Sequence, residues 1–187
     1  MTDIERRELW IEMSIREIWT QCHFAEISYK NIDKKSARPT DMAFSSIHSF
    51  LSHCTMVSKL LKGSEMGKDG EQIGQDIGQI LGIDGTSVIH RRKFRNHLEH
   101  YDERLKGWID RYEDGTTIGT YNIGPKSMFD EQNTMFISHH DNETKTFTFL
   151  DQDLDLGELY NEIERVKELA NSWVKSMEKD EMIPPIG

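Results

Sequence analysis

The strongest helical pattern in the chain lies in residues 94–112, with the sequence FRNHLEHYDERLKGWIDRY. Its apolar residues recur three or four positions apart and fall within roughly 100° of one another on a helix. They are Phe94, Leu98, Tyr101, Leu105, Trp108, Ile109 and Tyr112. This stripe predicts a central core helix from about residue 86 to 112.

Three further segments have the apolar spacing of helices. In residues 3–30 the apolar positions are Trp10, Met13, Ile18, Cys22, Ala25 and Tyr29. A second helix is predicted to begin at Pro39 and to end at Gly63, with Phe44, Ile47, Leu51, Cys54, Val57 and Leu61 inside. Asp155 and Glu158 form a capping-box pattern before the last seam, which is Leu159, Ile163, Val166, Ala170, Trp173 and Met177.

Residues 63–85 hold seven of the 13 glycines. Four of them recur every fourth residue: Gly70, Gly74, Gly78 and Gly82. Because glycine costs roughly 1 kcal/mol relative to alanine inside a helix, this bare stripe predicts close approach to another helix. The spacing does not match a P-loop, and no strand pattern precedes it.

Residues 114–153 differ from the rest, because Gly115, Gly119, Gly124 and Pro125 interrupt helix formation. Two β-favouring runs, 134–138 and 144–150, flank residues 139–143, which predicts a β-hairpin between helices. The adjacent His139 and His140 would point to opposite faces of a strand, so a solvated hairpin tip is favoured over a metal site. The predicted fold is mainly α: an antiparallel four- to five-helix bundle with this small insertion before the last helix.

The composition is that of a soluble globular protein, with 36% hydrophobic and 30% charged residues. At 187 residues we expect a single domain, 1–187, with a flexible tail at 180–187. The sequence has no run of ~20 apolar residues and no secretion signal, which favours a cytoplasmic protein without membrane contact. Cys22 and Cys54 are predicted to be apolar packing residues. We expect no cofactor and no metal.

The net charge is −10, from 23 basic and 33 acidic residues, and this field opposes general attraction to nucleic acid. The one dense basic cluster is Arg91, Arg92, Lys93 and Arg95. It is either the exposed side of its helix or a contact for an RNA backbone. Opposite Phe94 on the same helix lies a polar face made of Asn96, His100, Glu103 and Gly107.

Arg95-Asn96-His97-Leu98-Glu99-His100 resembles the R-x4-6-H signature of the HEPN superfamily, including a polar residue after the arginine. The resemblance extends over about residues 40–112 and the last helix. It implies a single HEPN-like helical domain that forms a homodimer through the central helix. In active members it implies a metal-independent endoribonuclease site shared between protomers, as in toxins or defence effectors. The glycine-rich stretch and the hairpin depart from the family pattern.

The chemistry of these residues suits RNA cleavage. Histidine has an ordinary pKa of ~6.5, so His100 can take the proton of a 2′-hydroxyl group. The Arg95 guanidinium can stabilise the charge on the phosphorane, and Asn96 can position the phosphate or the imidazole. Arg95 and His100 are about 140° apart on one helix, so a symmetric pair of helices would bring them together around one cleft. Arg91, Arg92 and Lys93 would then guide the RNA backbone.

Three alternatives remain at this stage. Arg95 and Glu99 can form an ordinary surface pair worth ~0.3–0.5 kcal/mol. The chain can be an inactive HEPN-like dimeric module. Such a module would bind RNA, or it would bind a protein partner such as a cognate antitoxin or a regulatory protein. The chain can also be a metal-dependent helical bundle that uses His97, Glu99, His100 or Glu103, although the usual di-iron pattern is missing from the sequence.

Overall fold

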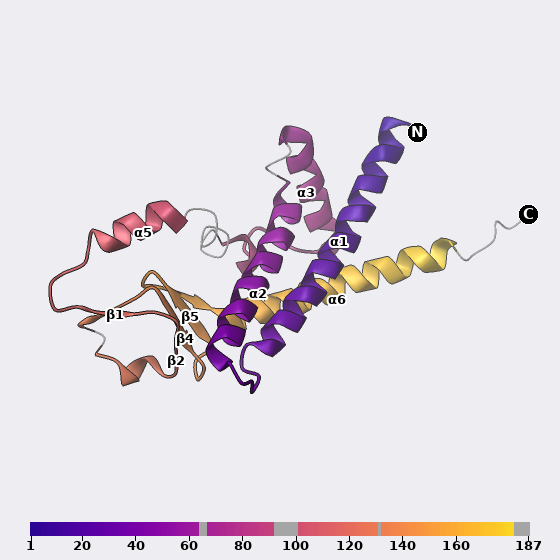
Figure 1. Ribbon diagram of the computed structural model, residues 1–187. Helices are drawn as coiled ribbons and strands as arrows, with labels where there is room; N and C mark the ends of the chain where they lie inside the picture. Colours follow the sequence, from indigo (N-terminus) through magenta and orange to yellow (C-terminus); the bar gives the residue numbers. More distant parts are fainter. Residues whose placement is uncertain (64–66, 92–100, 131, 182–187) are drawn as a thin grey trace, which may run out of the picture.

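The computed structural model describes residues 1–63, 67–91, 101–130 and 132–181, and it is mainly α. The helical elements are α1 (Asp3–Asn31), α2 (Pro39–Lys62), α3 (Gly67–Leu81), the 3₁₀ turn η2 (Val88–His90), α5 (Tyr101–Ile109) and α6 (Leu156–Glu181). Helices α1, α2, α3 and α6 gather in one body, with a small sheet region at one end (Figure 1). The predicted tail falls mostly on residues 182–187, which lie outside the described residues.

Helix α1 starts with a capping box, because Thr2 Oγ1 accepts a hydrogen bond from the Glu5 amide while the Glu5 carboxylate accepts one from the Thr2 amide. Its buried apolar stripe is Ile11, Ile15, Ile18, Cys22 and Ala25. The prediction that Trp10 and Met13 belong to this stripe is wrong, since they are 36% and 56% exposed. Ile11 and Ile15 continue the period of Ile18 and Cys22, whereas residues 10 and 13 turn toward solvent.

Helix α2 matches its prediction closely. All six of its predicted core residues are buried, and α2 makes its most extensive contact with α1. It ends at Gly63, whose left-handed conformation (φ 59°) suits glycine and whose amide donates to the Lys59 carbonyl. The thiols of Cys22 and Cys54 are free and buried, and burial raises the pKa of Cys22 to about 12. Both therefore act as apolar packing residues, as predicted.

The glycine-rich segment forms helix α3, which packs against the end of α2. A Cβ atom on Gly74 would lie 2.6 Å from the carbonyl carbon of Lys62, so only glycine fits there. A Cβ atom on Gly78 would lie 3.0 Å from the Ile83 carbonyl oxygen. The predicted close approach of this helix to a neighbouring one is therefore confirmed.

Helix α6 carries the predicted seam. Asp155 caps its first turn by accepting a hydrogen bond from the Glu158 amide at 2.8 Å. Leu159, Ile163, Val166 and Ala170 are fully buried. The α6 helix packs mainly on α1, which joins the N-terminal and C-terminal helices in one core. No helix in the described ranges is long and apolar enough to cross a membrane.

Six short strands lie between α5 and α6: β1 (Thr117–Gly119), β2 (Asn122–Ile123), β3 (Thr134–Phe136), β4 (Ser138–Asp141), β5 (Thr146–Phe149) and β6 (Gln152–Asp155). Strand β1 pairs with β3 in parallel, and a mixed sheet has the order β2-β4-β5-β6. The sequence predicts only one hairpin in this region. The described part of this region has two small sheets, because the short runs 117–119, 122–123 and 152–155 also pair.

The prediction of a solvated tip at residues 139–143 is wrong for the two histidines. His139 and His140 lie in strand β4 and are 0% and 1% exposed. Phe129 and Phe136 cover His139, with ring centroids 5.3 and 4.7 Å from the imidazole. His140 Nε2 lies 3.1 Å from Asp33 Oδ1 after helix α1, so the strand is covered on both faces.

The central core helix predicted over residues 86–112 can be compared only at its two ends, because residues 92–100 lie outside the described residues. Residues 88–90 form a 3₁₀ turn where the sequence predicts this helix, and the described helix α5 spans Tyr101–Ile109, apart from the other helices (Figure 1). Ile109 and Tyr112 are 54% and 44% exposed, while Trp108 is buried. The sheet region also contributes Phe147, Phe149, Leu150 and Leu154 to the buried core, which the sequence predicts from helices alone.

Candidate functional site

The predicted catalytic residues Arg95, Asn96 and His100 and the predicted RNA contacts Arg92 and Lys93 all fall on residues 92–100, outside the described residues. The structure therefore does not test their proximity. It does describe the segments on both sides of this motif: residues 83–91 before it and α5 after it.

The segment before the motif is anchored to the helical core. Val88 and Ile89 of η2 are buried, and Ser87 caps the turn by accepting a hydrogen bond from the Ile89 amide. The Ser87 hydroxyl also donates to Glu162 on α6. Lys62 at the end of α2 donates from Nζ to the His90 carbonyl at 3.0 Å. The chain therefore enters the motif from a point fixed by both α2 and α6.

Arg91 is the only member of the predicted basic cluster that lies within the described ranges. Its Nη1 donates to Glu158 Oε2 at 2.6 Å, and about half of its side chain remains exposed (52%). An exposed pair of this kind contributes roughly 0.2–1 kcal/mol. Arg91 therefore meets the first turn of α6 and still presents part of its guanidinium to solvent.

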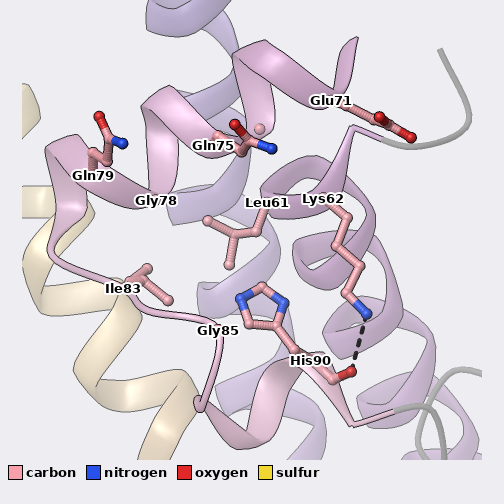
Figure 2. Close-up of a pocket in the computed structure, with 10 residues that line it drawn as sticks. Leu61, Lys62, Glu71, Gln75, Gly78, Gln79, Ile83, Gly85 and His90 are labelled. Carbon is pink, nitrogen blue, oxygen red and sulfur yellow. Dashed lines mark hydrogen bonds between the residues drawn. The ribbon is translucent and has the colours of Figure 1, made fainter. Parts of the chain in front are cut away.

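An open cavity of about 630 Å³ lies beside this anchor, between the end of α2, helix α3 and residues 83–90. Its lining includes Leu61, Lys62, Gln75, Gln79, Ile83 and His90. Figure 2 shows the His90 ring directed toward Leu61 and Ile83, with the two glutamines on the α3 side. The lining thus combines an apolar floor with two carboxamides and an imidazole.

The His90 imidazole is neutral near pH 7. Burial lowers the pKa of His90, and the nearby Lys62 lowers it further, while Glu162 and Asp84 oppose the shift. Its Nδ1 atom is buried and has no hydrogen-bond partner within the part of the chain that the structure describes. Local sequence patterns do not predict His90 as a site residue, because its position beside the cavity depends on the fold of α3.

The segment after the motif is a short, mostly exposed helix. Trp108 anchors α5, and Leu105 packs partly against the core. Glu103 and Gly107 of the predicted polar face are exposed, and a Cβ atom on Gly107 would meet nothing within 4 Å. Arg104 lies over the Phe149 ring at 6.0 Å, and burial lowers its pKa. The described half of the polar face is therefore accessible to another molecule.

In the described ranges, no group of three or more His, Cys, Asp or Glu side chains is arranged so that it could hold a metal ion. His97, Glu99 and His100, from the metal-bundle alternative, lie outside those ranges. Comparisons with protein families, with curated proteins and with solved structures find no match.

Proposed function

We propose that this protein is a HEPN-like endoribonuclease that acts as a homodimer and needs no metal ion. The observation that carries the proposal is the Arg95–His100 motif. Two features support it: the motif follows a segment anchored to α2 and α6, and it precedes a helix whose polar face is exposed. The proposed architecture is an antiparallel HEPN-like bundle whose partner subunit contacts the helix of the motif.

The proposed reaction is an internal transesterification of RNA. His100 takes the proton from a 2′-hydroxyl, and the 2′-oxygen attacks the adjacent phosphorus. The bond from phosphorus to the 5′-oxygen breaks, and a second, protonated imidazole, His100 of the partner subunit, returns a proton to this leaving oxygen. The products are a 2′,3′-cyclic phosphate and a 5′-hydroxyl. Arg95 stabilises the charge that develops on the phosphoryl oxygens, and Asn96 positions the phosphate.

The first prediction tests this role of His100. We expect wild-type protein to cleave single-stranded RNA in the presence of EDTA and to leave cyclic phosphate ends, detected by mass spectrometry. Because general acid–base catalysis contributes about 10²–10⁴-fold, His100→Ala should lower the cleavage rate at least a hundredfold. His97→Ala is the matched control and should change the rate less than tenfold. Unchanged melting temperatures would show that both variants fold; equal cleavage by wild type and His100→Ala would refute the proposal.

A second candidate is a HEPN-like module without turnover, which binds RNA, an antitoxin or a regulatory protein. Two observations favour its protein-binding form over RNA binding: the net charge of −10 opposes RNA binding, and Arg91 is already paired with Glu158. For this candidate, purified protein would bind its partner but would not cleave RNA. His100→Ala would therefore cause no change in RNA cleavage.

A further inference from the structure

We propose that the cavity between α2, α3 and residues 83–90 is a subsite for one unpaired nucleobase of the RNA. The inference rests on the proposed function for the identity of its ligand. The described residues that line the cavity all lie before the Arg95–His100 motif in the sequence. The subsite would therefore determine which base is held near the cleavage site and would take no part in bond breaking.

The size of the cavity suits a base with part of its ribose. Its volume of about 630 Å³ lies within the ~300–1,000 Å³ typical of small-molecule sites. Leu61 and Ile83, both buried, supply apolar contacts for a ring face. The His90 imidazole lies beside them and offers a planar surface for stacking, a usual way in which proteins hold unpaired bases.

The polar groups of the cavity suit the edge of a base. Gln75 and Gln79 are one turn apart on α3, and both line the cavity. Each carboxamide has an oxygen that accepts and an NH₂ group that donates, and base edges present the same mixture of groups.

The charges in the cavity favour a neutral ligand over a phosphate group. Among the described residues of its lining, the charged ones are one lysine, Lys62, and one glutamate, Glu71, so their formal charges cancel. The Lys62 ammonium group points to the His90 carbonyl (Figure 2), and His90 itself is neutral near pH 7. A phosphate would therefore meet little net positive charge, while a base needs only hydrogen bonds and ring contacts.

The position of the cavity links it to the motif. His90 closes one side of the cavity, and Arg91 and the basic cluster follow at once in the sequence. A base in the cavity would thus leave its ribose and phosphate near the start of this cluster. This placement connects base recognition to the proposed cleavage site along a continuous nucleotide chain.

The test measures binding of the four ribonucleosides to the full chain by NMR titration. We expect at least one nucleoside to bind saturably and to shift the signals of His90, Gln75 and Gln79. The double variant Gln75→Ala/Gln79→Ala should raise the Kd of that nucleoside at least tenfold. Gln72→Ala, on the same helix but outside the cavity lining, should change it less than twofold. Gly85→Leu should also abolish binding, because residue 85 lines the cavity and has open space around it.

Two results would overturn the inference: no saturable binding of any nucleoside, or equal Kd values for the Gln75/Gln79 and Gln72 variants. Its failure differs from failure of the proposed function. Nucleoside binding that depends on Gln75 and Gln79, in a protein that cleaves no RNA, would support the subsite and refute the ribonuclease. RNA cleavage with a base preference that the Gln75/Gln79 variant leaves unchanged would support the ribonuclease and overturn the subsite.

Discussion

His139 illustrates how one buried imidazole links the sheet region to the stability of the molecule. The residue is fully buried between Phe129 and Phe136, and neither ring nitrogen has a partner within the described part of the chain. Burial is the main cause that lowers the pKa of His139, with a smaller opposing effect from Asp141. The neutral form is therefore favoured in the folded state, and protonation favours unfolding.

The second prediction follows from the sign of this shift. The pKa of His139 is lower in the folded state than in the unfolded state. Protonation of His139 therefore does not destabilise the fold above about pH 6.5, and its destabilising effect grows as the pH falls below that value. The unfolding free energy of wild type should therefore decrease between pH 7.5 and pH 5. His139→Phe, which suits the aromatic surroundings, should reduce this decrease. Urea denaturation at the two pH values measures it, and an unchanged pH dependence in the variant would contradict the prediction.

At the scale of elements, the packing of α3 on α2 gives a third prediction. Gly74→Ala should lower the unfolding free energy by about 1–3 kcal/mol, because the added methyl group meets the α2 backbone, which cannot move aside easily. This loss should exceed the gain of roughly 1 kcal/mol in helix propensity. Gly107→Ala on α5 is the control, since the position is open, and it should stabilise the protein by up to ~1 kcal/mol. Stabilisation by both substitutions would show that α3 does not depend on glycine at this contact.

The elements that could be predicted from the sequence are those in which one apolar stripe faces one core. The seams of α2 and α6 meet this condition, and their predicted core residues are largely buried. The described end of the stripe of residues 94–112 meets this condition only in part, because Trp108 is buried while Ile109 and Tyr112 are exposed. Periodicity shows that residues can share a face, but it does not show what covers that face.

The pairing of β1 with β3 and of β2 with β4 depends on contacts between distant segments, which local patterns do not contain.

For the candidate site, the sequence and the structure contribute different parts. The Arg95–His100 motif is visible in the sequence alone, since it is a short contiguous pattern. The cavity lined by His90 cannot be predicted from the sequence, because its described lining comes from the end of α2, from one face of α3 and from residues 83–90. The glycine stripe is the sequence pattern that concerns this part of the fold. It predicts the contact between α3 and a neighbouring helix, but it does not predict the cavity next to that contact.

At the scale of the whole molecule, the proposed site requires a second copy of the chain, because Arg95 and His100 would lie about 140° apart on an ideal helix. The described half of the polar face, with Glu103 and Gly107, is exposed and could contact the partner subunit. An isologous contact repeats each residue across the twofold axis, so a bulky side chain at Gly107 would enter the interface twice.

The fourth prediction is therefore that Gly107→Trp converts a dimer to a monomer and lowers RNA cleavage in parallel. The substitution should leave the fold of each protomer intact, since a Cβ atom at residue 107 meets nothing within 4 Å and its backbone conformation is ordinary. Light scattering coupled to size-exclusion chromatography measures the mass of the particle. Gly85→Trp is a control for the bulk of the side chain, because residue 85 is equally open but lies on the cavity before the motif, and it should remain dimeric. A Gly107→Trp variant that stays dimeric would show that the interface lies elsewhere. A monomeric wild-type protein would contradict the proposed site, because no partner subunit would supply a second His100 to each Arg95.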